Sequence, residues 1–374
     1  MKRYMFFALA MMMCSTVSVY AQISVGYVKM KDGAEYVGEV KGKKPNGKGK
    51  TVYTNGDVYD GHYLKGKRQG MGMQTYKNGE KYMGEWSEDL RHGHGLFYSV
   101  NNNLYDGMWR NNDQHGKGKM LYYNGDSYNG EWSHNLRNGK GVYCWKGGAT
   151  YDGEWKDDLK DGKGVMVWQD GSKYEGEWQS GLRHGKGTFY YVNGDKYVGH
   201  WENDVQNGKG EYFFSNGEKY EGDYLEGERT GKGVYTYPNG DRYVGEFKNG
   251  WQDGFGEFYW SNGALYKGAW LRNQRSGYGV YEWGNGDRYV GEWKNNVAEG
   301  VGELKTMDEV YKGNFVGGRE NGLGVITTSK NTIIEGEFKD GKKNGVFVEK
   351  ETSGNVIKRI EYRNGRILKE ENIK

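Results

Sequence analysis

Lysines, acidic residues and histidines recur at regular intervals along the 374-residue chain, and they are the side chains with which it could do chemistry. A lysine stands between two glycines every 23 residues, at Lys117, Lys140, Lys163, Lys186, Lys209 and Lys232. Such a row predicts a surface that attracts anions, such as an anionic lipid or membrane surface. Acidic residues recur with the same period, as at Glu131 and Glu154. The alternative is therefore that acids pair with the lysines and leave a hydrated face.

The remaining candidates do not form a pattern typical of an enzyme. The sequence contains no Gly-x-Ser-x-Gly, no His-Glu-x-x-His and no P-loop. No helix pattern follows the Gly-Lys-Gly units, so they lack the N-terminus that a phosphate site needs. His92, His94 and His115 fall close together in the repeat and suggest a metal site, although hydrated loop histidines are the simpler interpretation. We expect no enzyme activity, no cofactor and no bound metal.

Composition narrows the class of protein further. Lys and Arg number 53 against 50 Asp and Glu, so the net charge of +3 is too small for a typical nucleic-acid-binding protein. The chain has 65 Gly and 33 Tyr but only 2 Pro. This combination excludes collagen, which needs abundant Pro, and disfavours disorder, which is poor in aromatic residues. Glycine with tyrosine indicates short strands joined by tight turns.

The residues that must position these side chains form an internal repeat of 23 residues. Tyrosine marks its first position at Tyr36, Tyr59, Tyr82, Tyr105, Tyr128, Tyr151, Tyr174, Tyr197, Tyr220, Tyr243, Tyr266 and Tyr289, and Tyr311 and Ile334 continue the series. Counting from the tyrosine, glycine occupies positions 3, 12 and 14, an acid often stands at position 4, and an aromatic residue stands at position 5. Positions 16 and 18 are mostly aromatic, and Asn-Gly follows them.

Each repeat reads as a β-hairpin. Side chains alternate between the faces of a strand, so positions 1, 3 and 5 share one face. We expect positions 12, 14, 16 and 18 to share the same face, with the rings packed over the glycines. Asn-Gly predicts a hairpin turn, and positions 6 to 11, such as 179–184, are expected to form a longer loop at the opposite edge. The predicted fold is all-β: an elongated array of about fourteen antiparallel hairpins in one long, twisted or curved sheet.

The motif resembles the MORN repeat (membrane occupation and recognition nexus), here of a bacterial exported type. It is seen clearly in Tyr174-Glu-Gly-Glu-Trp178, Gly185-Lys-Gly187 and Asn193-Gly-Asp195. The resemblance implies a non-enzymatic protein that acts in tethering, assembly or dimerisation. It also implies membrane or phosphoinositide binding as an alternative. The family's shared positions are structural, so the resemblance by itself assigns no binding residue.

The ends of the chain differ from the repeats. Lys2 and Arg3 precede an uncharged, largely apolar stretch that ends near Ala21, which predicts a cleavable signal peptide over 1–21. Cys14 is too early for a lipoprotein site, and Cys144 would then be the one cysteine left. We expect a repeat array over 22–353 and a half-repeat with a charged tail over 354–374. The expected location is periplasmic or extracellular, with outer-membrane association as an open alternative.

Position 13 changes character late in the chain. After Lys232 it becomes apolar, at Phe255, Tyr278, Val301, Leu323 and Val346. This stripe predicts contact with a protein partner or a second copy of the chain. The alternative is a local adjustment of the core. Tyr98, Tyr190 and Tyr259 offer another alternative, glycan binding through exposed rings.

Overall fold

The structure is a computed structural model that describes residues 24–373, which contain strands and turns but no helix. The predicted signal peptide over 1–21 lies outside the described residues. The described residues belong to two compact units. The first runs as far as Lys146 and includes Lys156–Asp158, and the second comprises Gly147–Trp155 and the chain from Leu159 onward. Within 24–373, no helical segment is able to span a membrane.

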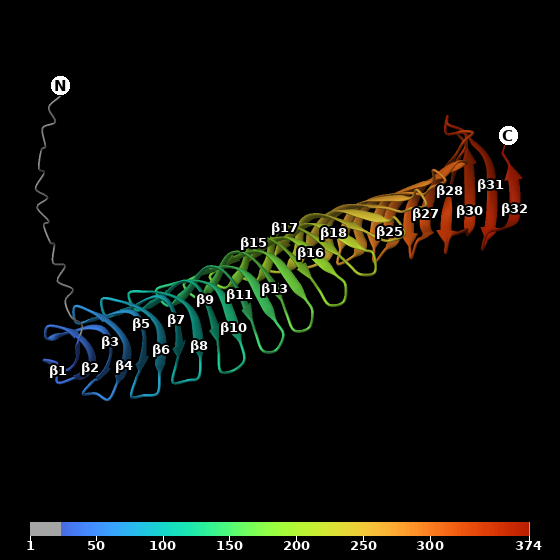
Figure 1. Ribbon diagram of the computed structural model, residues 1–374. Coiled ribbons are helices and arrows are strands. Elements are labelled where there is room, and N and C mark those ends of the chain that lie inside the picture. The colour runs from blue at the N-terminus through green and yellow to red at the C-terminus, as the bar shows by residue number, and fades with distance from the viewer. Residues whose placement is uncertain (1–23, 374) are drawn as a thin grey trace, which may run out of the picture. The chain divides into compact units, whose positions relative to one another are not determined.

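The first unit is an antiparallel sheet in which each strand pairs with the next one in the chain (Figure 1). Its strands are β1 (Ser24–Lys29), β2 (Glu35–Lys41), β3 (Lys44–Val52), β4 (Val58–Leu64), β5 (Lys67–Thr75), β6 (Lys81–Ser87), β7 (Leu90–Tyr98), β8 (Leu104–Arg110), β9 (Asp113–Leu121), β10 (Ser127–Ser133) and β11 (Leu136–Cys144).

The second unit has the same hairpin pattern, and it contains all of β12 except Lys156. Its strands are β12 (Thr150–Lys156), β13 (Leu159–Val167), β14 (Lys173–Gln179), β15 (Leu182–Tyr190), β16 (Lys196–Glu202), β17 (Val205–Phe213), β18 (Lys219–Leu225), β19 (Glu228–Thr236), β20 (Arg242–Lys248), β21 (Trp251–Tyr259), β22 (Leu265–Leu271), β23 (Gln274–Glu282), β24 (Arg288–Lys294), β25 (Val297–Lys305), β26 (Glu309–Val316), β27 (Arg319–Thr328), β28 (Ile333–Lys339), β29 (Lys342–Lys343), β30 (Gly345–Lys350), β31 (Val356–Arg363) and β32 (Arg366–Asn372). Strand β28 pairs with both β29 and β30, and the last three strands pair in order. The predicted all-β fold of antiparallel hairpin repeats is confirmed.

The relative lengths of the two turns in each repeat are the reverse of what the sequence predicted. Between β14 and β15 the chain turns in two residues, Ser180 and Gly181, which both have positive φ (49° and 90°). Positive φ at both central residues matches the right-handed twist of paired strands, so the strands run on to the turn. The predicted longer loop over positions 6 to 11 is therefore wrong. The Asn-Gly connection is the longer one, and Tyr191 N–H donates to Asp195 O across it at 2.9 Å.

A ladder of aromatic rings holds successive hairpins together within each unit. The Tyr174 ring is fully buried between Trp178 of its own repeat and Trp201 of the next, with centroids 5.1 and 5.5 Å away and near-perpendicular planes. The edge-to-face arrangement places the positive edge of one ring on the negative face of the other. The Tyr174 hydroxyl donates to Glu177 O at 3.0 Å, and Trp178 Nε1 donates to Gly164 O at 3.3 Å. No polar atom of these rings is thus buried without a partner.

Two of the three glycines of each repeat make room for this ladder. Cross-strand pairing of Gly187 with Gly199 and of Phe189 with Tyr197 confirms that positions 1, 3, 14 and 16 share one face, here called the aromatic face. A Cβ on Gly176 or Gly187 would overlap the Tyr174 ring. The prediction that rings pack over glycines is confirmed for positions 3 and 14.

The prediction that position 12 shares the aromatic face is wrong. Gly185 has a φ of 60°, and a Cβ there would meet the Glu177 carboxylate at position 4 and not a ring. The register between β14 and β15 shifts after Gly176, so Gly185 and Lys186 form a β-bulge opposite Glu177. A bulge leaves a backbone N–H without a ladder partner. In other repeats the acid accepts that N–H: Glu85 from His94 at 3.0 Å and Glu246 from Phe255 at 3.2 Å.

Candidate functional site

The bulge decides where the position-13 side chain points. The position-13 residue lies between two glycines. A Cβ on the glycine at position 14 would overlap the tyrosine ring of the aromatic face, and a Cβ on the glycine at position 12 would meet the position-4 acid. The side chain therefore lies on the opposite side of the sheet from the aromatic face. We call this side the outer face, and it carries positions 2, 4, 13 and 15. Within each unit, position-13 residues pair with position 4 of the following repeat, as Lys163 does with Glu177 and Lys232 with Glu246.

The six lysines predicted as an anion-binding row are all exposed on the outer face. Lys117 and Lys140 belong to the first unit, and the other four belong to the second. Lys209 forms an ion pair with Asp223 at 2.6 Å, and Lys117 lies opposite Glu131. Lys186 lies opposite His200. Most of the row therefore has acidic neighbours, which weakens its attraction for an anionic surface.

The apolar stripe predicted as a partner surface is also exposed. The exposed fraction is 52% at Phe255, 65% at Tyr278, 69% at Val301, 81% at Leu323 and 59% at Val346. These side chains are not part of a core, so the alternative of a local core adjustment is wrong. All five stand in successive hairpins of the second unit.

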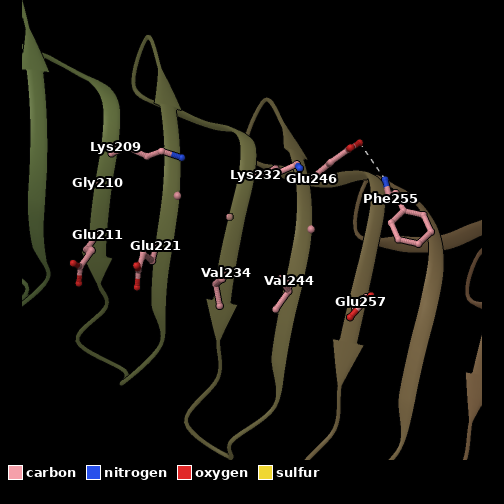
Figure 2. A pocket seen from close by; sticks show the side chains of 13 residues that line it. Lys209, Gly210, Glu211, Glu221, Lys232, Val234, Val244, Glu246, Phe255 and Glu257 are labelled. Carbon is pink, nitrogen blue, oxygen red and sulfur yellow. Dashed lines mark hydrogen bonds between the residues drawn. The ribbon is translucent and has the colours of Figure 1, made fainter.

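A shallow groove of about 770 Å³ lies on the outer face where the lysines give way to the stripe. Figure 2 shows Lys209, Lys232 and Phe255 along one side of it, and Val234 and Val244 lie among the residues of the other side. Two glutamates on that second side are neutralised: Glu211 by Lys219 at 2.8 Å, and Glu257 by Lys267 at 2.7 Å. The groove thus places paired charges beside the apolar side chains of Val234, Val244 and Phe255.

Acidic side chains alternate with the apolar stripe. Tyr278 lies opposite Glu292, and Leu323 lies opposite Glu337. Glu246 precedes Phe255 and accepts its backbone N–H. Within the part of the chain that the structure describes, none of these three carboxylates is in an ion pair with a basic side chain. At Glu292 and Glu337 the stripe therefore combines apolar side chains with negative charge that no ion pair compensates, whereas Glu246 lies opposite Lys232.

The histidine and tyrosine candidates do not converge on a site. His94 Nε2 lies 2.9 Å from Asp106 Oδ1, and the nearest ring contact of His115 is with His134, at 6.3 Å between centroids. Among residues 24–373, no three His, Cys, Asp or Glu side chains are placed to hold a metal. Tyr98 is 46% exposed, whereas Lys173 Nζ lies 4.4 Å from the Tyr190 ring centroid and Arg242 Cζ lies 4.9 Å from that of Tyr259. Cations therefore already occupy the ring faces of two of the three tyrosines.

The sequence reasoning missed a row of basic residues on the aromatic face. At position 10, Arg183 Cζ lies 4.3 Å from the Trp201 ring centroid, and its guanidinium donates to Asp204 Oδ1 and Asp204 O at 3.0 and 2.8 Å. Equivalent arginines occur at Arg68, Arg91, Arg137, Arg229 and Arg275. Position 10 has the same parity as positions 14, 16 and 18, which could have identified the row. These arginine side chains cover the aromatic rings of the ladder.

Hairpins of 23 residues, joined by rings that pack over glycines, define a β-hairpin repeat protein. The profile of the MORN repeat family matches fourteen segments, and the chain belongs to that family. The matched residues are 36–58, 59–81, 82–104, 105–127, 128–150, 151–173, 174–196, 197–219, 220–242, 243–265, 266–288, 289–306, 311–333 and 335–346. Such repeats form a repeat scaffold or interaction module.

Comparisons with other proteins add little to the family assignment. No curated protein matched the chain. Among solved structures, the chain is similar to the TCP domain of SAS-4 from Drosophila melanogaster in complex with a proline-rich motif, with 16% identity over 42% of this chain and 85% of that chain and a TM-score of 0.27. It is also similar to the TCP10 domain of CPAP from Danio rerio, with 9% identity over 64% and 92% and a TM-score of 0.17. It is also similar to virginiamycin B lyase from Staphylococcus aureus, with 12% identity over 88% of this chain and 95% of that chain and a TM-score of 0.13. Likenesses this weak carry no functional argument.

Proposed function

We propose that this protein is a non-enzymatic scaffold of the cell envelope, whose second unit binds a polypeptide partner along the apolar stripe. The observation that carries the proposal is the exposure of five large apolar side chains in successive hairpins. A single exposed apolar residue needs no explanation, but exposed apolar residues at the same position of five successive hairpins indicate an interaction surface.

The charge of the stripe indicates the chemistry of the partner. Glu292 and Glu337 lie among the apolar residues without an ion pair to a basic side chain, whereas Glu246 lies opposite Lys232. A partner that supplies lysine or arginine between its apolar side chains would complement them. Two copies of the stripe facing each other would instead bring acids together, which disfavours a second copy as the occupant.

The spacing of the stripe favours a helical partner segment. Each hairpin adds two strands, so successive stripe residues are roughly 10 Å apart along the sheet. Seven residues of an α-helix rise about 10.5 Å and return to nearly the same side of the helix. An extended segment covers about 10 Å in three residues, but its third residue points to the opposite face. An amphipathic helix with apolar residues at heptad spacing therefore fits the stripe.

A designed peptide tests this proposal directly. The probe is a 28-residue helical peptide with leucine every seventh residue and lysines beside each leucine, measured by fluorescence anisotropy. We expect binding to the parent protein, and at least about tenfold weaker binding to a Tyr278→Ser, Leu323→Ser double variant, because both anchors are lost. Lys186→Ser, which changes an exposed residue of the lysine row, is the matched control and should bind as the parent does.

Three results would overturn the proposal. One is equal binding to the double variant. Another is stronger binding of a peptide in which glutamate replaces lysine. The third is a doubled mass in light scattering that the double variant abolishes, which would identify a second copy as the occupant. Both substitutions lie at exposed positions, so the fold should persist, and circular dichroism checks this.

Export is a separate part of the proposal. Its support is the charged start and apolar stretch of residues 1–21. N-terminal sequencing of protein recovered from the periplasm or medium should begin close to Gln22. Recovery of the intact N-terminus in the cytosol would contradict export and leave the proposed partner surface untouched.

A further inference from the structure

The first unit carries a methionine cluster on its outer face that the scaffold function does not use. Met71 and Met73 lie on β5 and Met83 on β6, and their exposed fractions are 56%, 38% and 48%. Gly72, between the first two, lies under the Tyr59 ring on the aromatic face, so Met71 and Met73 share the outer face. Met73 pairs directly with Met83 across the two strands.

Strand geometry brings the three thioethers within reach of one another. Residues directly opposite on paired strands have Cβ atoms about 4.5–5.5 Å apart, and diagonal pairs are about 7–8 Å apart. Met73 and Met83 are an opposite pair, and Met71 and Met83 are a diagonal pair. A methionine side chain has three rotatable bonds, so the three sulfur atoms can converge on one point above the strands.

A histidine beside the cluster is held in the tautomer that a metal needs. His62 on β4 sits where the β4–β5 register shifts, and its Nδ1 lies 3.0 Å from Met71 O. A carbonyl oxygen only accepts, so Nδ1 carries the proton in this hydrogen bond. The Nε2 atom then keeps its lone pair, and a hydrogen bond from Nδ1–H to a backbone carbonyl is the usual support of a metal-ligating histidine.

The same positions in the second unit have a different chemistry. There, position 13 carries lysine as far as Lys232 and then apolar residues such as Phe255 and Leu323, none of which has a donor sulfur. A surface that needed only apolar area would not require methionine in the first unit. Asp60 lies opposite Met73 and places one negative charge beside the neutral sulfur atoms. Glu85 lies opposite Met71, while Lys48 and Lys50 on β3 lie opposite His62 and Asp60. The cluster thus combines soft donors, one imidazole and two adjacent carboxylates.

We propose that Met71, Met73, Met83 and His62 form a binding site for one soft monovalent cation of the Cu(I) class. Thioether sulfur selects such ions over zinc, calcium or magnesium. Thioethers carry no proton, so the three sulfur ligands need no deprotonation to bind. The site lies within the first unit and is independent of the apolar stripe in the second.

Silver(I) is the probe for this site, because it is a soft monovalent ion that stays in one oxidation state. The full chain, labelled with ¹³C at the methionine methyl groups and ¹⁵N in the histidine rings and with both cysteines replaced by serine, is titrated in chloride-free buffer and followed by NMR. We expect saturation at one equivalent, with shifts at the methyl groups of Met71, Met73 and Met83 and at His62 Nε2. The methyl group of Met307, which is 89% exposed in a turn, should not move.

Variants decide whether these residues hold the ion. A Met71→Leu, Met73→Leu, Met83→Leu protein should bind silver(I) at least about tenfold more weakly, since the selective ligands are lost. Leucine nearly conserves the volume of methionine, so the fold should persist, and Met83→Leu alone provides a milder test. Met307→Leu is the matched control and should bind as the parent does.

Unchanged affinity in the triple variant would overturn the proposal. Methyl shifts spread equally over all methionines would also do so, because they would show non-specific contact. A third contrary result is preferential binding of zinc(II) that is lost in His62→Ala but kept in the triple variant. A surface that binds only a polypeptide would show no silver(I) response at the three methyl groups.

Discussion

At the scale of single residues, glycine at positions 3 and 14 is required by the neighbouring tyrosine ring. Gly187 lies beneath Tyr174, and the ring fills the space where a Cβ would be. This packing also explains why a chain so rich in glycine is ordered. The glycine is the complement of a buried aromatic side chain, and each partner is needed because of the other.

Replacing Gly187 by alanine should therefore be costly. The added Cβ pushes the Tyr174 ring out of place, and we expect the free energy of unfolding to fall by about 1–3 kcal/mol, as for overpacked cores. Denaturant unfolding measures the change. Gly147→Ala is the control, because its Cβ would lie 3.4 Å from the flexible Gln169 side chain, and its effect should be within about 0.5 kcal/mol. Equal effects of the two substitutions would refute the ring-over-glycine explanation.

Lys160 is the exception in the row of basic residues that covers the tryptophans. Its Nζ lies 3.7 Å from the Trp178 ring centroid. Arg183 pairs with Asp204 of the following repeat, but the corresponding residue in the repeat after Lys160 is Gly181, which has no carboxylate. Burial lowers the pKa of Lys160 to about 8. The unfolded chain, with a lysine pKa of about 10.4, binds a proton that the folded chain has lost between these two values. Stability from this group therefore rises with pH from about 8 to about 10.4 and is flat below.

The Lys160→Gln variant tests this dependence. Its stability relative to the parent should be most favourable at and below pH 8, because glutamine carries no buried charge. The advantage should shrink as the pH approaches about 10.4, where both states of the parent are neutral. Paired denaturant curves across this range measure the difference. Lys163→Gln, at an exposed lysine, is the control, and a difference for Lys160→Gln that does not change with pH would contradict the lowered pKa.

At the scale of the hairpin, the position-4 acid stabilises the bulge. Glu246 accepts the Phe255 N–H, whereas the next repeat has Ala269 at position 4 and so lacks this acceptor for Tyr278. The chain thus contains both versions of the bulge. An acid at position 4 is therefore explained by the backbone of its own hairpin, before any role in binding lysine.

Ala269→Glu should supply the missing acceptor. We expect the free energy of unfolding to rise by about 0.5–1.5 kcal/mol, the net value of one hydrogen bond, and the Tyr278 amide to exchange more slowly with solvent. Glu246→Ala should have the opposite effect on the Phe255 amide. Hydrogen exchange followed by NMR measures both. An unchanged Tyr278 amide in Ala269→Glu would show that the acid does not serve the bulge.

At the scale of the whole molecule, stability comes from contacts between neighbouring repeats. Burial raises the pKa of the ladder tyrosines, as at Tyr174, Tyr197 and Tyr220, and raises that of Tyr266 to about 12. An unfolded chain loses these protons near pH 10 while the folded chain keeps them. The contribution is fully present below pH 10 and is lost as the pH rises through the higher folded values.

Alkaline unfolding should consequently be steep. We expect the ladder tyrosines to ionise together with loss of the sheet, well above pH 10, because many identical groups are linked to one transition. Tyrosinate absorbance and circular dichroism, recorded on the same samples, measure the two events. Ionisation of all tyrosines near pH 10 with the sheet intact would contradict the burial of the ladder.

The sequence alone determined the repeat, the hairpin, the family and the face that tyrosine and tryptophan share. These follow from the 23-residue period and from the alternation of side chains between the two faces of a strand, which are local properties present in every repeat. The sequence also placed Lys117 to Lys232 and Phe255 to Val346 on one position of the repeat. It misplaced the loop, although paired residues such as Asn111-Asn112 and Asn295-Asn296 are typical of a two-residue turn with positive φ.

Only the tertiary structure decided what each repeated position does. It showed that Gly185 faces Glu177, because a bulge changes the register within the hairpin, and that Arg183 covers Trp201 of the next repeat. It also showed that the apolar stripe is exposed and that Met71, Met73 and Met83 gather beside His62. Residues on different strands become neighbours only through pairing, and a one-dimensional period does not specify which of them meet.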